Sequence, residues 1–103
     1  VPNSRHDRML LQKVVLHTCD IGHFASTWET HVDWSQRVRL EFNAQCASER
    51  ERGIPVSSFL EVPNDTAMAK SQVGFANFIV LPIWDTLAVS LPMLQPVCSL
   101  IRL

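Results

Sequence analysis

The chain has 103 residues, of which 47% are hydrophobic and 18% charged, and its formal net charge is −1. This composition is typical of a globular chain of one small domain at most, and it excludes an intrinsically disordered segment. Because no basic field is present, we do not expect nucleic acid as a partner.

The first predicted helix runs from about Ser4 to Cys19. Gly22 follows it and accepts the left-handed backbone conformations that end or bend a helix. The apolar residues of this segment cover an arc too wide for a surface helix, so we expect burial on several sides. They are Met9, Leu10, Leu11, Val14, Val15 and Leu16.

The pair His6-Asp7 occurs in one class of metal-dependent phosphohydrolases. At a helix start we interpret it as structural, since Asp7 favours the positive end of the helix dipole.

A second helix is predicted to begin at Ser26, because Ser26 and Glu29 have the spacing of a capping box. Gly53 and Pro55 are expected to stop it. Several residues of this segment recur at intervals of three and four and therefore share one continuous face. They are Trp28, His31, Ser35, Val38, Phe42 and Gln45.

The third predicted helix spans residues 66–80, with Asn64 or Asp65 as its cap. Pro82 should break or kink it, and a further helix is expected over residues 84–91. Few stretches alternate with period two, so the predicted fold is all-α, with helices packed in more than one layer.

Residues 75–101 carry a single charged side chain, Asp85, and could be interpreted as a membrane span. Prolines and polar residues interrupt this apolar run, and a membrane helix tolerates such breaks only with help from neighbouring helices. We therefore expect no membrane span in this segment. The favoured interpretation is buried helices of a domain that extends beyond this chain.

Four side chains capable of binding a metal lie within the short segment HTCDIGHF: His17, Cys19, Asp20 and His23. His17 and Cys19 are two positions apart and do not face each other on a helix, so a closed local zinc site is not expected. Asp20 could still join ligands brought from elsewhere. The alternative is that it serves as a helix cap or an ion-pair partner.

Gln72 and Phe75 are three positions apart on the third predicted helix and share a face. A glutamine amide offers both a donor and an acceptor, so it could pair with the edge of a purine that stacks on the phenylalanine ring. In the alternative interpretation, Phe75 belongs to the core and Gln72 lies on the surface.

A series of motifs follows in one order along the chain: DRMLLQKVVLH, DIGH, WETHVDW, ERERGIPVS, KSQVGF and FIVLPIWDT. With this order and nearly gapless spacing, the chain resembles the class I cyclic nucleotide phosphodiesterases over almost its whole length. The resemblance implies a multi-helical, all-α catalytic domain of which residues 1–103 are the C-terminal part. It also implies hydrolysis of a 3′,5′-cyclic nucleotide, cAMP and/or cGMP, to the 5′-monophosphate.

The resemblance implies a site with two divalent ions, Zn²⁺ and Mg²⁺ (or Mn²⁺). Such ions lower the pKa of the attacking water and neutralise charge on the phosphoryl oxygens. Asp20 matches the family's second metal-binding aspartate. The family's two metal-binding histidines, its other aspartate and its general-acid histidine lie upstream of the matched segment. We therefore expect no catalytic residue in this chain and no activity of these residues alone.

A purine pocket is the second implied site. Gln72 matches the glutamine that pairs with the purine, while Phe75 and Val38 match the aromatic and aliphatic halves of a clamp around the base. His23 matches a position near the base, and His31 one whose side chain often orients the glutamine amide. The remaining matched positions are the small polar Ser35 and the apolar wall residues Ile21, Phe42 and Phe59.

One departure from the family pattern lies beside the aspartate. Phe24 stands where the family usually has proline, so the loop after Asp20 is expected to follow a different course. Two alternatives to the enzyme stay open. One is a non-catalytic helical nucleotide-binding or interaction module of a degenerate relative. The other is a structural helical domain whose apolar C-terminal third docks a partner.

Partners and location complete the expectations. The resemblance implies a cyclic nucleotide substrate, the remainder of the catalytic domain and, as a further expectation, a second copy in a homodimer. Three widely spaced cysteines without a CxxC motif, and an N-terminal stretch unlike a signal peptide, favour a reducing, cytoplasmic compartment. Other regions of the parent protein could still associate it with a membrane.

Overall fold

The computed structural model describes residues 3–102, and every element within them is helical. The helices are α1 (Arg5–Asp20), α2 (Trp28–Glu51), α3 (Asp65–Phe75), α4 (Leu81–Ser90) and α5 (Gln95–Ile101). Shorter segments join them: the 3₁₀ turns η1 (Gly22–Ala25), η2 (Ser58–Leu60) and η4 (Pro92–Leu94), and the π-helical segment η3 (Ala76–Val80). No strand occurs among the described residues, which confirms the all-α prediction.

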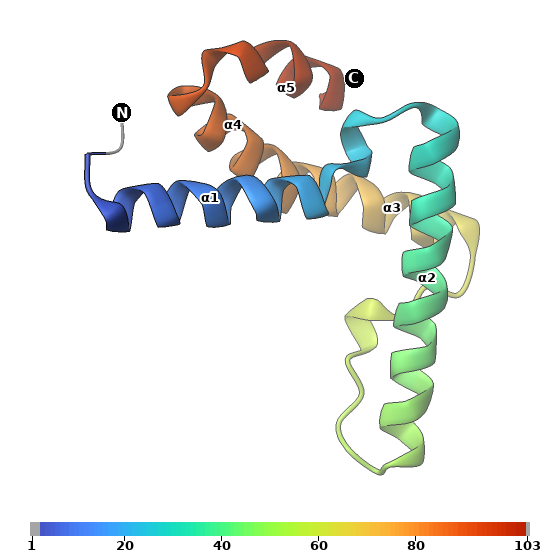
Figure 1. The fold of residues 1–103 in the computed structure, drawn as a ribbon. Helices are drawn as coiled ribbons and strands as arrows, with labels where there is room; N and C mark the ends of the chain where they lie inside the picture. The colour runs from blue at the N-terminus through green and yellow to red at the C-terminus, as the bar shows by residue number, and fades with distance from the viewer. Residues whose placement is uncertain (1–2, 103) are drawn as a thin grey trace.

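The helices form a body and a projecting arm (Figure 1). In the body, α1 and α5 both pack against α4. The arm consists of α2 and the segment 52–64, which returns along it. The radius of gyration is 16.4 Å, whereas a compact domain of this length has about 13 Å. The described residues are therefore more extended than an independent domain of this size.

Polar contacts hold the returning segment of the arm to α2. The side chain of Asn43 exchanges two hydrogen bonds with the backbone of Val62, at 2.8 and 3.1 Å. Arg50 donates to both carboxylate oxygens of Glu61 at 2.7 Å. Gly53 makes the reversal itself with φ of 65°, a left-handed conformation that favours glycine. The expectation that Gly53 ends this helix is thus confirmed.

Short polar side chains cap the N-termini of α1, α2 and α3. Ser4 and Asp7 form a capping box at the start of α1. Asn64 caps α3 by accepting a hydrogen bond from the Ala67 backbone at 2.8 Å. The predicted capping box of Ser26 is wrong, because α2 begins two residues later with Thr27 as its cap. The Ser26 hydroxyl donates to the backbone carbonyls of His23 and Thr27, whereas the Thr27 hydroxyl accepts the hydrogen bond from the Thr30 backbone N–H at 3.3 Å.

Pro82 does not break the helix that precedes it. The backbone stays helical from Asp65 to Ser90, and the π-helical segment η3 lies directly before the proline-containing turn. A π segment changes the hydrogen-bond spacing locally and so accommodates the missing backbone N–H of proline. The proline carbonyl accepts a hydrogen bond from Thr86 Oγ1 at 2.7 Å. The irregularity expected at Pro82 therefore takes the form of a π segment rather than a helix end.

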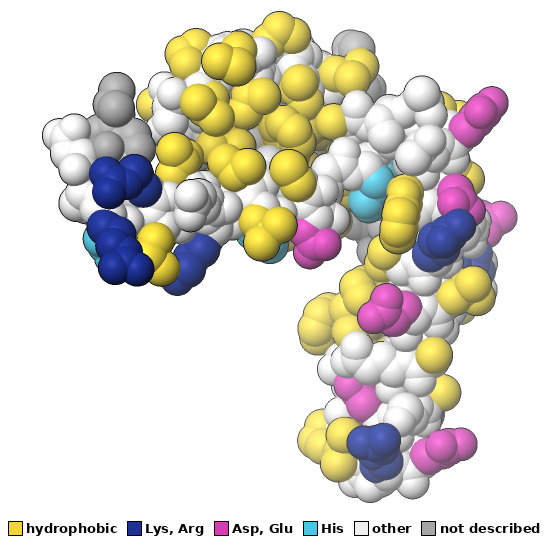
Figure 2. Space-filling model, in the orientation of Figure 1, with side chains coloured by type: hydrophobic (Ala, Val, Ile, Leu, Met, Phe, Trp, Pro, Cys, Tyr) yellow, Lys and Arg dark blue, Asp and Glu magenta, His cyan; other side chains and the backbone are white. Residues whose placement is uncertain are grey.

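Few large side chains are fully buried among the described residues. The buried apolar set is Cys46, Val62, Val80, Leu87, Ala88 and Cys98. Figure 2 shows instead a broad cluster of hydrophobic side chains on the surface over α4 and α5. Val89, Met93 and Leu100 in this region are 80%, 77% and 51% exposed. We call these three residues and the surface around them the apolar face.

The prediction that α1 is buried on several sides is not met within the described residues. Leu10 and Leu16 are 54% and 73% exposed. The physical reason is that α1 packs against α4 and the turn η1, while its remaining sides meet no other part of residues 3–102 closely. Its wide apolar arc therefore adds to the uncovered surface of the body.

One helical stretch, Asp65–Ser90, is long and apolar enough to cross a membrane by length and composition alone, since an 18-residue window within it has a mean hydropathy of 1.5. Buried core helices of soluble proteins reach the same length and hydropathy. The interpretation of this stretch as part of a domain interior stays a prediction.

Candidate functional site

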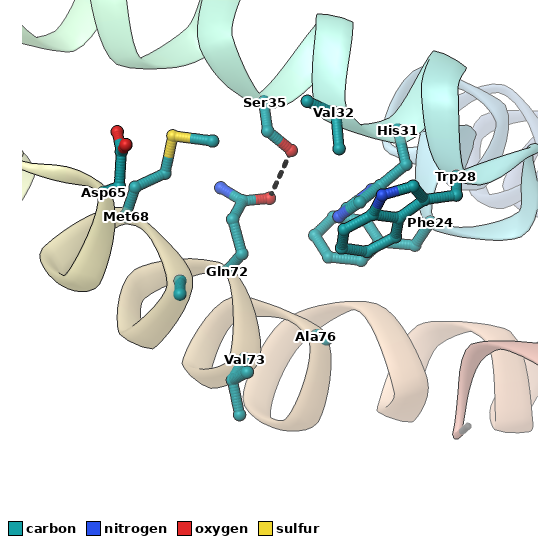
Figure 3. A pocket seen from close by; sticks show the side chains of 11 residues that line it. Phe24, Trp28, His31, Val32, Ser35, Asp65, Met68, Gln72, Val73 and Ala76 are labelled. Carbon is teal, nitrogen blue, oxygen red and sulfur yellow. Dashed lines mark hydrogen bonds between the residues drawn. The ribbon is translucent and has the colours of Figure 1, made fainter.

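Two neighbouring cavities adjoin at Gln72 on α3. The first, which we call the serine cavity, has a volume of about 330 Å³ and lies between α2 and α3; its lining includes His31, Ser35 and Gln72 (Figure 3). The second, which we call the aspartate cavity, has a volume of about 1010 Å³. Its lining includes Asp20, Ile21, His23, Val38, Phe42, Gln72 and Phe75. The structure thus brings nine of the ten residues singled out in the sequence around one glutamine.

Phe59 is the tenth, and the structure does not bring it to either cavity. It lies in the turn η2 on the arm and is 83% exposed. The reason is the course of the segment 52–64, which follows the C-terminal half of α2 away from the body (Figure 1). A wall position for Phe59 therefore has no support from the described residues.

The amide of Gln72 is oriented by Ser35. The serine hydroxyl donates to Gln72 Oε1 at 3.1 Å across the gap between α2 and α3. Ser35 is 1% exposed, so this bond is shielded from water and geometrically defined. Figure 3 shows the amide nitrogen on the side away from Ser35, where it remains available as a donor. The sequence resemblance assigned this orienting contact to His31, which makes no hydrogen bond to Gln72 within residues 3–102.

His31 bonds instead to His23 from the turn η1. The two Nδ1 atoms are 3.0 Å apart, and the ring planes are inclined by 21°. Burial lowers the pKa of His23, and the neighbouring charge of His31 lowers it further. Burial also lowers the pKa of His31. Because the ordinary value is about 6.5, both rings are neutral near pH 7.

The ring of Phe24 packs near both histidine rings and near Phe75, the candidate aromatic contact for a purine. Its ring centroid lies 4.5 Å from that of His23, 4.8 Å from His31 and 5.8 Å from Phe75. These are distances at which aromatic rings attract each other. The sequence predicts an altered loop course from Phe24 as a replacement for proline, but no packing role for its ring. Its aromatic character, four residues after Asp20, was the available signal for a packing role.

Trp84 is a second residue that sequence reasoning missed. It lines the aspartate cavity, and its indole Nε1 is buried without a hydrogen-bond partner among residues 3–102. A buried N–H without a partner is costly, so it marks a place where an acceptor from a ligand or from further chain fits.

Asp20 is the last residue of α1 and lines the aspartate cavity. A carboxylate oxygen is a suitable ligand for Mg²⁺ or Zn²⁺. However, no group of three or more histidine, cysteine, aspartate or glutamate side chains that could hold a metal occurs within residues 3–102. The residues present fit one ligand of a metal site that other residues must complete.

Taken together, the two cavities can bind a flat, partly polar molecule. The Gln72 amide offers a fixed donor, Phe75 offers an aromatic surface, and Val38 offers an aliphatic one in the same cavity. Asp20, which has a carboxylate, lines that cavity as well. This combination suits a heteroaromatic base joined to an anionic group that a metal neutralises.

Replacing Ser35 with alanine is expected to lower the free energy of unfolding by about 1 kcal/mol, because it leaves the Gln72 amide oxygen without its buried donor. Urea unfolding of the protein measures this change. Ser48→Ala on the same helix, outside both cavities, is the matched control and should change stability less. Equal losses for the two variants would show that the contact with Gln72 contributes nothing.

Comparison with known proteins identifies the family. The family model for 3′5′-cyclic nucleotide phosphodiesterases matches residues 1–101. A 3′,5′-cyclic-AMP phosphodiesterase 4 of Dictyostelium discoideum is 35% identical over 81% of this chain and 8% of its own length. A dual specificity calcium/calmodulin-dependent 3′,5′-cyclic nucleotide phosphodiesterase 1 of Drosophila melanogaster is 40% identical over 74% of this chain and 9% of its own.

The name of a third relative includes both cyclic AMP and cyclic GMP. The dual 3′,5′-cyclic-AMP and -GMP phosphodiesterase beta of Plasmodium falciparum is 32% identical over 80% of this chain and 7% of its own length. The chain thus spans less than a tenth of the length of these three curated relatives. No solved structure matches it. With a family model that covers residues 1–101, the chain belongs to the 3′,5′-cyclic nucleotide phosphodiesterase family.

Proposed function

We propose that this chain is the purine-pocket part of a metal-dependent phosphodiesterase that hydrolyses cAMP and/or cGMP to the 5′-monophosphate. The observation that carries the proposal is the amide of Gln72, which Ser35 orients at 3.1 Å where the two cavities meet. A fixed amide beside an aromatic ring recognises the polar edge and the flat face of one base at the same time.

Each residue then has a role that follows from its chemistry. Gln72 donates its amide N–H to an acceptor on the purine edge. Phe75 and Val38 contact the two faces of the ring and exclude water from that hydrogen bond. Asp20 binds a divalent cation through its carboxylate, with Zn²⁺ and Mg²⁺ or Mn²⁺ as the proposed ions. Bound metals would supply an activated water and neutralise the charge of the cyclic phosphate.

The remainder of the catalytic domain is the proposed partner of the apolar face. The Asp20 carboxylate needs further ligands, and Val89, Met93 and Leu100 need an apolar cover. One covering domain that also supplies the metal ligands and the general acid would meet both requirements. The short span of this chain within its relatives supports such a partner.

Hydrolysis assays test the proposal. The complete protein, supplied with Mg²⁺ and Zn²⁺, should convert cAMP or cGMP to the 5′-monophosphate and should lose this activity in a chelator. The isolated 103 residues should show no turnover. Nucleotide binding by the complete protein without hydrolysis would support a degenerate, non-catalytic relative instead. Turnover by the isolated chain would contradict the assignment of the metal ligands to other residues.

A further inference from the structure

The contact between His23 and His31 limits how the two rings are protonated. Their Nδ1 atoms lie 3.0 Å apart, which is a normal hydrogen-bond distance between nitrogens. Two protonated Nδ1 atoms at this distance would repel each other, and so would two bare lone pairs. The bridge therefore holds one hydrogen, which one ring donates and the other accepts.

This arrangement fixes the character of the two outer nitrogens. In a neutral imidazole one nitrogen carries hydrogen and the other does not. The ring that donates through Nδ1 has a bare Nε2, which is an acceptor. The ring that accepts through Nδ1 carries its hydrogen on Nε2, which is a donor. His23 lines the aspartate cavity and His31 the serine cavity, so the two cavities are lined by rings whose outer nitrogens have opposite hydrogen-bonding character.

We propose that His23 and His31 act as one proton-sharing unit that sets the hydrogen-bonding polarity of the base-binding cavities and so discriminates between adenine and guanine. The proposal rests on the proposed function. Ser35 already occupies a lone pair of the Gln72 amide oxygen, while the amide nitrogen remains a donor. When His23 is the ring with the bare Nε2, that nitrogen is the acceptor that the 6-amino group of adenine requires.

Uptake of one proton changes this polarity without breaking the bridge. The proton adds to the bare Nε2, and the N–H of the other ring stays where it was. Both outer nitrogens are then donors, and the unit carries one positive charge shared over the Nδ1–H···Nδ1 bond. Two outward donors suit the carbonyl oxygen of guanine and oppose the amino group of adenine.

The charged surroundings of the unit are limited. Asp20 at the end of α1 and Glu41 from α2 line the aspartate cavity with His23. From α3, Asp65 lines the serine cavity, where it is paired with Arg39 at 2.8 Å.

Asp85 from α4 and Arg102, which follows α5, are charged as well and pair with each other. Burial is the leading cause of the lowered pKa at both histidines. We therefore expect proton uptake by the unit below the ordinary histidine value of about 6.5.

The protonation pattern can be measured without any nucleotide. Long-range ¹H–¹⁵N spectra of the complete protein with labelled histidine should show one ring protonated at Nδ1 and the other at Nε2 near neutral pH. The variants His23→Asn and His31→Asn assign the signals. Detection of a common tautomer, or of two rings that titrate independently at the ordinary value, would overturn the proposal.

The functional consequence is measured as a ratio. Between about pH 7.5 and 5.5, the kcat/KM for cAMP relative to cGMP should fall at least about fivefold, the effect of one lost hydrogen bond. Both substrates share one metal centre, so its own titration cancels in the ratio. His23→Asn should remove this pH dependence, whereas His17→Asn, on an exposed part of α1, should retain it.

The outcomes separate the two proposals. A ratio that stays constant with pH, or that still falls in His23→Asn, overturns the proton-sharing unit while the phosphodiesterase assignment stands. Absence of hydrolysis of both nucleotides by the metal-loaded protein overturns the proposed function. In that case the tautomer spectra still decide whether His23 and His31 share one proton.

Discussion

Replacing Asp20 with asparagine in the complete protein is expected to lower kcat about a thousandfold and to reduce bound metal. The change keeps the size of the side chain but removes the negative charge that attracts a divalent cation at the edge of the aspartate cavity. A loss of several kcal/mol of transition-state stabilisation corresponds to this factor, at about 1.4 kcal/mol per tenfold. Metal analysis of the purified protein and steady-state hydrolysis measure the two effects.

Asp33→Asn is the matched control for this prediction. Asp33 is an exposed aspartate of α2 whose partner is Arg37 on the same helix, at 3.0 Å. Exposed pairs of this kind contribute little to stability, so both metal content and kcat should stay near their original values. If Asp20→Asn retained its metal and its kcat, Asp20 would not be a metal ligand, and the proposed catalytic role of this segment would be wrong.

Replacing Gln72 with alanine should lower kcat/KM for the preferred nucleotide by about 10- to 100-fold, mainly through a higher KM. The reason is that the amide contacts a part of the substrate that does not react, so its loss weakens ground state and transition state alike. One to two hydrogen bonds to the base, at about 1 to 1.5 kcal/mol each, account for the range. Steady-state kinetics with cAMP and cGMP separate KM from kcat.

Lys70→Ala provides the comparison for Gln72. Lys70 lies on the same helix, is exposed and lines neither cavity. Its removal should leave kcat/KM for both nucleotides within about twofold, as is usual for surface substitutions. An unchanged KM in Gln72→Ala would mean that the amide does not contact the base, and that the contact with Ser35 serves packing alone.

Much of the fold was predictable because the helix signals are local. The left-handed Gly53 acts through its own backbone neighbours and was identified correctly, and of the two predicted caps of α3, Asn64 and Asp65, the structure uses Asn64. The choice between Ser26 and Thr27 was not predictable in the same way. Both have a hydroxyl, and only the path of the turn η1 decides which of the two can reach the first free N–H of α2.

Pro82 shows a different limit. Propensity rules describe what proline does to a regular α-helix, whereas here the preceding residues adopt π-helical spacing. That spacing depends on packing, since Val80 within the π segment is fully buried. Local sequence carries no comparable signal for a π segment.

The candidate site was predictable as helix faces but not as contacts. The spacing of three and four residues placed His31, Ser35 and Val38 on one face of α2, and these residues do line the cavities. The bond from Ser35 to Gln72 joins residues 37 apart in sequence, and the packing of α2 on α3 creates it. The pairing of His23 with His31 likewise depends on the turn η1, whose course Phe24 helps to define.

The apolar face has a consequence for how this region folds. A chain segment that leaves Val89, Met93 and Leu100 in water gains little free energy by folding alone. Its native state is then coupled to the burial of these side chains by neighbouring chain. We expect the amide protons of α4 to exchange only through global opening of the complete domain, so that α4 forms part of the same cooperative folding unit as the helices that cover it.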